Sequence, residues 1–192
     1  MTIMYIHGYG SDGNALKGKM LRAMLPTHRV VSPTFDYDRM TPQAVQALVR
    51  KTVEEEGVKM LVGSSFGGYH ALCATQFFHG PVWAVNPVSD VEETIRRVVA
   101  DADGSRLAVY HAFDREVFRR QVALNQSGRW PEETPLHFAL STDDELLGDH
   151  TGLLALFPRH RQVVWKEDCG HRFLRFKELE SDFLATIKII ER

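Results

Sequence analysis

Residues 59–78 read KMLVGSSFGGYHALCATQFF, and this stretch decides the fold. Its first four residues, Lys59–Val62, are short and apolar and predict a buried strand, whereas Phe66–Phe78 predicts a helix. Between them, residues 63–67 have the pattern G-x-S-x-G. This pattern between a strand and a helix is typical of a sharp turn that exposes a nucleophilic serine. The serine at the centre of the turn is Ser65.

The pattern G-x-S-x-G is loose, and a turn of small residues before a helix is the simpler interpretation. The context favours a nucleophile, because glycines at positions 63 and 67 remove the side chains that would collide in so tight a turn. Ser64 does not fit, since the residues two positions away from it are Val62 and Phe66. We therefore predict Ser65 as the nucleophile.

Short apolar runs alternate with amphipathic stretches along the rest of the chain. The runs lack clean polar alternation, as in strands that helices cover on both faces. Alternation of this kind predicts an α/β fold with a mostly parallel, doubly wound sheet of about six strands. The expected strands are Ile3–Ile6, Arg29–Val31, Lys59–Val62, Val82–Val85, Leu136–Leu140 and Gln162–Trp165. The expected helices between them are Ala15–Leu25, Pro42–Glu56, Phe66–Phe78, Asp149–Phe157 and Arg172–Glu191.

The alternation breaks once, over residues 88–134. This segment holds two further helical patterns, Val91–Ala100 and Arg115–Asn125, and no convincing strand. We expect one domain over residues 1–192, with a small helical lid inserted at 88–134. A longer crossover that packs on one face of the sheet is the alternative. The lid is favoured by four aromatic side chains that would form its apolar underside: Tyr110, Phe113, Phe118 and Trp130.

A serine hydroxyl is a weak nucleophile that needs an oriented base, and the base in turn needs a carboxylate. In enzymes with this turn, the partners follow the serine in the order acid, then histidine. An acidic run, Asp143-Asp144-Glu145, follows the fifth expected strand, and His171 follows the last one. A solvated loop is the ordinary interpretation of such a run. We choose Asp144 as the acid, with Asp143 as the main alternative.

His171 is preferred among nine histidines because it follows a glycine in a loop beyond the last strand. His150 is the closest competitor, but it lies in or near the helix after the acidic loop. His70 is five residues beyond Ser65 on the following helix, and we expect it to point away from the nucleophile. No pair of histidines has the spacing of a helical zinc motif, so we predict no metal.

The loop after the first strand, His7-Gly8-Tyr9-Gly10, is expected to complete the site. A loop at this position supplies one backbone N–H to the oxyanion that forms during acyl transfer, and the residue after the nucleophile supplies the other. These two donors would be Tyr9 and Phe66. We interpret His7 as a residue that shapes the loop.

The same loop contains a competing signal. Residues 8–13 match G-x-G-x-x-G, which after a strand and before a helix is typical of dinucleotide-binding proteins. A Rossmann-type oxidoreductase is therefore a hypothesis from another class. It needs an acidic residue at the end of the second strand, but that strand ends at Val31, and Asp36 comes several residues later. It also leaves the contexts of the serine, the acid and the histidine as coincidences.

The composition is that of an ordinary globular protein. Hydrophobic residues make up 44% and charged residues 25% of the 192-residue chain, which is long enough for one sizeable core. A net charge of −2 provides no field that attracts nucleic acid or an anionic membrane, so we expect neither as a partner. Two cysteines, and no apolar segment long enough for a signal or a membrane span, predict a cytoplasmic protein with reduced thiols. The oligomeric state stays open.

Several of these stretches together resemble the YqiA-like family of small bacterial esterases, within the α/β-hydrolase superfamily. The resemblance covers nearly the whole chain, is most specific over residues 62–69 and is slight between about 95 and 134. It implies the α/β-hydrolase fold with Ser65 as nucleophile, His171 as base and Asp144 as acid. The acid follows from the family's aspartate, which stands just before a glutamate and two aliphatic residues. The matching stretches are MYIHGY (4–9), VGSSFGGY (62–69), VNP (85–87), STDDE (141–145) and GHRF (170–173).

The resemblance also implies an esterase or thioesterase of simple acyl substrates that needs no cofactor. The leading hypothesis is thus a serine hydrolase that cleaves carboxylic esters or thioesters through a Ser-His-Asp triad and an acyl-enzyme. The alternatives are the dinucleotide-binding oxidoreductase and a non-catalytic binding protein of the same fold. The expected partner is a small acyl ester, with Tyr110, Phe113 and Trp130 lining the acyl side of its pocket.

Overall fold

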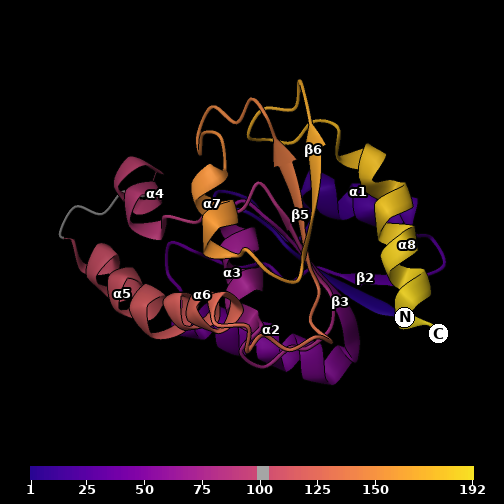
Figure 1. Ribbon diagram of the computed structural model, residues 1–192, viewed down its shortest axis with the longest axis horizontal. Coiled ribbons are helices and arrows are strands. Elements are labelled where there is room, and N and C mark those ends of the chain that lie inside the picture. Colours follow the sequence, from indigo (N-terminus) through magenta and orange to yellow (C-terminus); the bar gives the residue numbers. More distant parts are fainter. Residues whose placement is uncertain (99–103) are drawn as a thin grey trace.

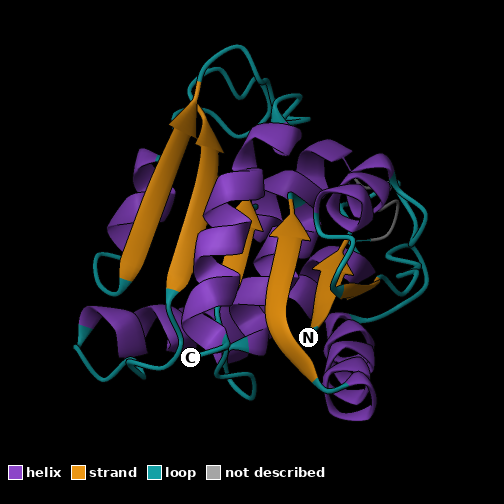
Figure 2. Ribbon diagram, turned by 90° about the vertical axis from the view of Figure 1, so that its right-hand side faces the viewer, coloured by secondary structure: helices purple, strands orange, loops and turns teal. Residues whose placement is uncertain are grey.

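The computed structural model describes residues 1–98 and 104–192, and in this part of the chain six parallel strands form one sheet (Figures 1 and 2). The order across the sheet is β2-β1-β3-β4-β5-β6, so the chain reverses direction along the sheet once, between β2 and β3. In such sheets ligands bind beyond the carboxyl ends of the strands, near the reversal. The strands are β1 (Thr2–Ile6), β2 (Arg29–Val31), β3 (Val58–Ser64), β4 (Val82–Val85), β5 (Leu136–Ser141) and β6 (Arg161–Lys166).

Helices cover both faces of the sheet (Figure 1). On one face lie α1 (Leu16–Met24) and α8 (Glu180–Ile190), preceded by the short 3₁₀ turn η2 (Phe176–Leu179). The other face carries α2 (Pro42–Glu56), α3 (Phe66–Ala74), α4 (Val91–Val98), α5 (Ser105–Phe113), the π-helical turn η1 (Asp114–Phe118), α6 (Arg119–Gln126) and α7 (Thr151–Leu156).

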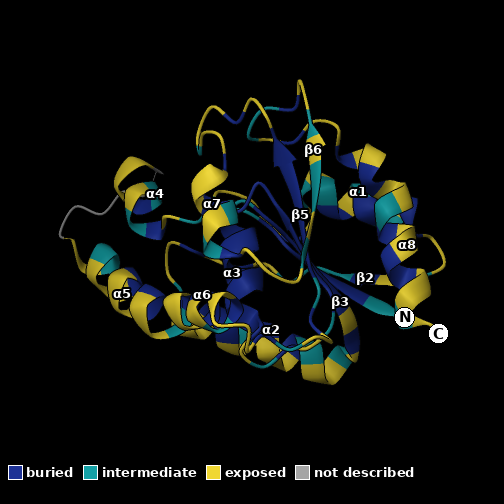
Figure 3. Cartoon of the chain, viewed as in Figure 1, coloured by how far each residue is buried: buried dark blue, intermediate teal, exposed yellow. Residues whose placement is uncertain are grey.

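The alternation of side chains along each strand explains the two layers. In β1, Ile3 and Tyr5 belong to the core beneath α1 and α8, whereas Met4 and Ile6 belong to the core beneath α2 and α3. Figure 3 shows the buried sheet between helices whose outer faces are exposed. Of the described helices, none combines the length and apolar character needed to cross a membrane.

The predicted strands agree with the observed ones to within two residues at each end. The helix predicted over Arg172–Glu191 is wrong at its start, because η2 begins only at Phe176 and α8 at Glu180. Positive φ values at Gly170 and Phe173 prevent a right-handed helix there. The residues before Phe176 therefore form turns, and these turns carry His171.

The segment 88–134 contains only helices and turns in its described part. The helix predicted over Arg115–Asn125 begins earlier, because α5, η1 and α6 follow one another from Ser105 to Gln126. This helical run contacts α2 and α3, as the crossover alternative requires. The predicted end of the preceding helix, Ala100, lies outside the described residues.

Candidate active site

Ser65 lies on the turn between β3 and α3, at the edge of the sheet where the strands end. Its φ of 55° and ψ of −120° are unusual for a residue with a side chain. Hydrogen bonds hold this conformation: the Ser65 N–H donates to Val85 O at 2.9 Å, and its carbonyl accepts from Gly68 N at 2.9 Å. This is the strained strand-to-helix turn that the pattern predicts.

Glycine is required at two positions of this turn. A Cβ on Gly63 would lie 2.4 Å from Gly67 O, and a Cβ on Gly67 would lie 2.1 Å from Ile6 O. Contacts this short with the backbone cannot be relieved by turning a side chain. The pattern G-x-S-x-G therefore follows from the close packing of α3 against the ends of β3 and β1.

The three residues predicted as a triad lie in contact. Ser65 Oγ is 2.8 Å from His171 Nε2, and His171 Nδ1 is 3.0 Å from each carboxylate oxygen of Asp144. Because an ionised carboxylate only accepts hydrogen bonds, Nδ1 carries the proton and Nε2 accepts from the Ser65 hydroxyl. This arrangement allows Nε2 to take the serine proton during an attack.

The Asp144 carboxylate is fully buried but well partnered. Its Oδ1 accepts from the backbone N–H groups of Leu146 at 3.0 Å and Leu147 at 2.9 Å. Burial favours the neutral acid, but the contacts with His150, His171 and Leu147 outweigh it and hold the pKa of Asp144 below its usual value. The carboxylate therefore stays charged at neutral pH.

Asp143, the alternative acid, points elsewhere. Its Oδ1 accepts from the Ser141 hydroxyl and, at 3.1 Å, from Cys169 N. The described residues show no hydrogen bond between Asp143 and the His171 ring. The geometry thus selects Asp144 as the partner of His171, and Asp143 joins the two loops instead.

Two side chains outside the triad hold the His171 loop. Glu145 Oε2 accepts from His171 N at 2.7 Å. Asn86 Nδ2 donates to Gly170 O at 3.0 Å and to His171 O at 3.2 Å, while its Oδ1 accepts from Ser141 N at 2.8 Å. Asn86 is fully buried and follows β4. It therefore connects the end of β5 to the loop beyond β6.

We expect Asn86→Asp to reduce stability and slow catalysis together. Aspartate keeps an acceptor for Ser141 N but loses both donors and sets a carboxylate oxygen against two carbonyls. Unpaired buried groups cost about 1–3 kcal/mol, and displacement of the His171 loop is expected to lower kcat at least tenfold. Urea unfolding and ester hydrolysis measure the two effects.

Asn125→Asp is the matched control for this substitution. Asn125 is also fully buried and also bridges backbone groups, donating to Arg159 O at 2.8 Å and accepting from Arg159 N at 3.0 Å. It lines no cavity that Ser65 also lines. The control should lose stability but keep its kcat, and a normal kcat in Asn86→Asp as well would contradict the role of Asn86.

A second histidine contacts the same carboxylate. His150 Nε2 lies 3.2 Å from Asp144 Oδ2, and the His150 side chain is 2% exposed. This contact lacks the geometry of a hydrogen bond. Within the described residues, the buried Nε2 of His150 therefore has no hydrogen-bond partner. His150 was the closest competitor for the base, but it lies against the acid rather than against Ser65.

His150→Leu is expected to lower kcat about tenfold with little change in KM, because it leaves Asp144 Oδ2 with one polar neighbour fewer. His150→Gln can offer an amide N–H to the same oxygen and is expected to recover part of the loss. Steady-state kinetics on both variants measures this. Equal losses in the two variants would show that the shape of the side chain matters, and not its N–H.

The loop after β1 passes directly beside the nucleophile. A Cβ on Gly8 would lie 3.3 Å from Ser65 Cβ. Buried His7 shapes this loop: Phe35 N donates to Nε2 at 2.9 Å, so the other ring nitrogen, Nδ1, carries the proton and donates to Gly8 O at 2.8 Å. Burial lowers the pKa of His7, which keeps the ring neutral.

The two residues predicted to supply oxyanion donors border the space at Ser65. Tyr9 and Phe66 both line the larger cavity there. Phe66 is the first residue of α3, where a backbone N–H has no acceptor within the helix. The Tyr9 N–H donates no hydrogen bond to another described residue. Both groups are thus available to a ligand.

Two cavities flank Ser65 and His171. The larger, of about 610 Å³, lies between α4 and the loop after β5, and its apolar wall is made by Phe66, Val88, Leu146 and Leu147. The smaller, of about 520 Å³, lies beside the start of α1 and the residues that follow His171. Both volumes are typical of small-molecule sites.

The prediction that Tyr110, Phe113 and Trp130 line the acyl pocket is wrong. None of them borders either cavity, and all three are at most 3% exposed. The Tyr110 ring packs behind Phe66 with centroids 5.3 Å apart, and Trp130 Nε1 donates to Thr134 O at 2.7 Å. Their apolar surface fills the core instead. The part of the segment 88–134 that borders the larger cavity is α4 with the residues just before it.

The last glycine of the dinucleotide-like pattern, Gly13, has a structural role. Gly13 N donates to Thr34 Oγ1 at 3.0 Å, and a Cβ on Gly13 would lie 2.2 Å from Ser32 O. The last glycine thus packs against the end of β2. The strand order also differs from the order 3-2-1-4-5-6 of the Rossmann fold, so the Rossmann hypothesis is wrong.

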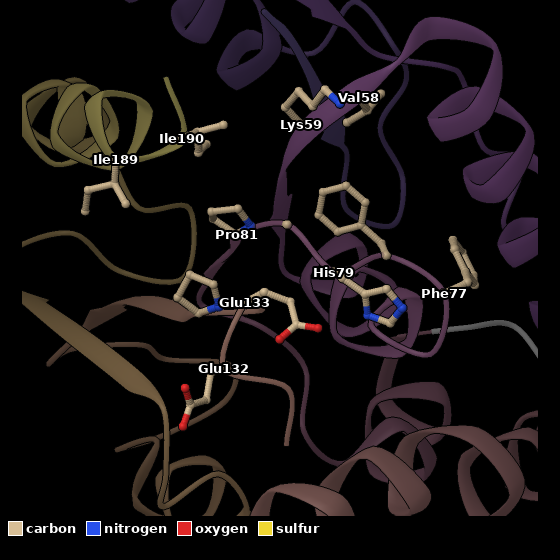
Figure 4. Close-up of a pocket in the computed structure, with 12 residues that line it drawn as sticks. Val58, Lys59, Phe77, His79, Pro81, Glu132, Glu133, Ile189 and Ile190 are labelled. Carbon is tan, nitrogen blue, oxygen red and sulfur yellow. The ribbon is translucent and has the colours of Figure 1, made fainter. Parts of the chain in front are cut away.

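A third cavity, of about 520 Å³, lies at the opposite edge of the sheet (Figure 4). It is bordered by Val58 and Lys59 at the start of β3 and by Ile189 and Ile190 at the end of α8. Ser65 follows the other end of β3, so this cavity is separate from the triad. Within residues 1–98 and 104–192, no group of histidine, cysteine or acidic side chains is arranged to hold a metal ion.

Comparison with known proteins places the chain in a family. The model of a family described as Uncharacterised protein family (UPF0227) matches residues 2–188. The chain belongs to this family. UPF0227 is the YqiA-like family, so the resemblance drawn from the sequence motifs is confirmed.

Solved structures similar to this UPF0227 chain have the α/β-hydrolase fold, which confirms the predicted fold. Est1E from Butyrivibrio proteoclasticus is 13% identical with a TM-score of 0.74, and the match covers 97% of this chain and 88% of Est1E. The esterase domain of a Rhodothermus marinus protein is 17% identical with a TM-score of 0.72, covering 96% and 85%. Mouse α/β hydrolase domain-containing protein 10 is 14% identical with a TM-score of 0.67, covering 98% and 90%.

The sequence reasoning missed the residues around the triad. Asn86 had a signal, because it follows a buried strand at the edge where the triad lies. Glu145 was noted as part of an acidic run and as the glutamate after the family's aspartate, and His150 only as a competing base. Their roles depend on contacts between separate loops, which spacing along the chain does not reveal.

Proposed function

We propose that this chain is a serine hydrolase that cleaves carboxylic esters or thioesters of simple acyl groups. The observation that carries the proposal is the continuous contact from Ser65 Oγ through the His171 ring to a buried, charged Asp144. A surface serine or a structural histidine has no need of such an arrangement. The fold is one that supports many chemistries, so the argument depends on the site.

The geometry suggests the following reaction. Ser65 Oγ attacks the carbonyl carbon while His171 Nε2 takes the hydroxyl proton, and the new oxyanion accepts from the N–H groups of Tyr9 and Phe66. His171 then gives its proton to the leaving alcohol or thiol, which leaves an acyl-Ser65 ester. Water, deprotonated by His171, attacks this ester and releases the acid. Each oxyanion donor contributes about 3 kcal/mol to such a reaction.

The larger cavity fits an acyl group. Its wall is apolar near Ser65, and burial of a hydrocarbon chain against such a wall stabilises the complex by about 25 cal/mol per Å². The reaction needs no cofactor, because the nucleophile, the base and the oxyanion donors all come from the chain. A non-catalytic binding protein of the same fold is the alternative, but it would not require the ordered proton path.

A fluorophosphonate probe tests the proposal directly. Such a probe reacts with an activated serine, and the adduct can be located by mass spectrometry of peptides. We expect one adduct, on Ser65, and hydrolysis of p-nitrophenyl acetate or butyrate that stops once Ser65 is labelled. Absence of both labelling and hydrolysis would favour the binding protein, and an adduct on another serine would overturn the site.

A further inference from the structure

The two cavities beside Ser65 differ in charge. The larger is bordered by three carboxylates, Asp90, Glu93 and Glu145, and by one cation, Arg97, which binds Glu93 at 2.6 Å. The smaller is bordered by two cations, Lys17 of α1 and Arg172 of the loop after β6, and by no carboxylate among the described residues. We call the smaller one the cationic cavity.

Neither cation of this cavity has a partner in the part of the chain that the structure describes. Among the described residues, the side chains of Lys17 and Arg172 make no hydrogen bond and no ion pair. Some cations elsewhere do have a partner, such as Lys166, which binds Glu178 at 3.1 Å. The pKa of Lys17 is lowered to about 8, mainly by burial and to a smaller extent by the positive charge of Arg172. Two cations that share a cavity without a counter-ion repel each other, and an anion between them would remove that cost.

The rest of the lining strengthens attraction to an anion. Tyr5, Ala15, Met20 and Phe173 make apolar walls beside half-buried Lys17, where Coulombic attraction increases because such walls exclude water, whereas Arg172 lies at the exposed side of the cavity. The cavity is also continuous with the chemistry, since Ser65 and His171 both border it. A group held there would belong to the molecule being cleaved.

We propose that the cationic cavity binds an anionic group, a carboxylate or a phosphate, carried by the ester or thioester that Ser65 attacks. This inference rests on the proposed function and narrows its substrate class. The scissile carbonyl lies at Ser65, the anionic end of the substrate extends toward Lys17 and Arg172, and the uncharged end occupies the apolar part of the larger cavity.

Pairs of esters that differ only in charge test this inference. A carboxylate on the acyl side is tested by p-nitrophenyl hemisuccinate against its methyl ester. A carboxylate on the leaving group is tested by p-acetoxybenzoate against methyl p-acetoxybenzoate. A phosphate is tested by p-acetoxyphenyl phosphate against its dimethyl ester. The readout is the ratio of kcat/KM for the charged and the neutral member, at low ionic strength where screening is weak.

Lys17→Met and Arg172→Met are each expected to lower this ratio about tenfold for at least one pair, since a hydrogen bond to a charged group contributes that much. The charged and the neutral ester of a pair also differ in intrinsic reactivity. This difference cancels, because the kcat/KM ratio of each variant is compared with the wild-type ratio for the same pair. The matched control is Lys19→Met, because Lys19 is an exposed lysine of the same helix that borders neither cavity. The control should keep the wild-type ratio.

The outcomes separate the two proposals. If the neutral esters are hydrolysed and Lys17→Met keeps the wild-type ratio for every pair, the anionic substrate is excluded and the hydrolase stands. The same holds if Lys19→Met lowers the ratio as much as Lys17→Met, since the effect is then one of general surface charge. If no ester is hydrolysed and Ser65 is not labelled, the hydrolase fails and the substrate class fails with it.

Discussion

Replacement of Ser65 by alanine is expected to lower kcat for p-nitrophenyl acetate on the order of 10⁶-fold, the size of effect seen when a triad nucleophile is removed. The reason is that Ser65 Oγ is the attacking atom of the proposed reaction, so His171 and Asp144 have no proton to move without it. Alanine fits the turn, because it only removes the hydroxyl. Thermal unfolding should therefore show a folded protein close to the wild type.

Ser64→Ala is the matched control for this experiment. Ser64 is the last residue of β3 and neighbours Ser65, yet the described residues show no hydrogen bond between its hydroxyl and His171. Ser64→Ala should still form a fluorophosphonate adduct on Ser65, whereas Ser65→Ala should form none. An adduct that persists in Ser65→Ala, or that is lost only in Ser64→Ala, would place the nucleophile at another position.

Asp144→Asn should lower kcat on the order of 10⁴-fold while leaving KM nearly unchanged. Asparagine keeps an oxygen for the N–H groups of Leu146 and Leu147, so the loop has most of its hydrogen bonds. If its NH₂ group faces His171 Nδ1, however, it favours the wrong tautomer of the ring. If its oxygen faces Nδ1, that oxygen carries no charge to stabilise the imidazolium. Steady-state kinetics over a series of pH values measures the loss.

The neighbouring substitution, Asp143→Asn, provides the comparison. Its side-chain oxygen can still accept from Cys169 N, which is the bond that joins the two loops. The expected loss in kcat is far smaller than for Asp144→Asn. If the two losses are reversed, Asp143 is the acid and the contact of Asp144 with His171 is structural.

Much of the fold and the triad could be predicted because their signals are local. A buried parallel strand is a short apolar run, and the G-x-S-x-G turn records close backbone packing that only glycine allows. The loops that carry Asp144 and His171 follow strands, and parallel strands end at one edge of the sheet. Chain order and strand ends were therefore sufficient to bring Ser65, the acidic run and His171 together, whereas the choice of Asp144 over Asp143 rested on the family resemblance.

The parts that failed depend on contacts between distant segments. Aromatic residues such as Tyr110 and Trp130 are typical of both a lid and a core, and their spacing does not say which side of a helix faces the sheet. The bonds of Asn86 and the contact of His150 join loops that lie far apart in the chain. The cations of Lys17 and Arg172 became informative only when the structure showed that no carboxylate among the described residues borders their cavity.

The site draws one group from the end of almost every strand. Tyr9 follows β1, Ser65 follows β3, Asn86 follows β4, and Asp144 and His171 follow β5 and β6. During synthesis on the ribosome, the nucleophile and its turn emerge long before the base. Under the proposed function, we expect a nascent chain to stay inert toward esters until the residues through His171 have left the exit tunnel, so that the onset of turnover reports that the edge strand β6 has joined the sheet.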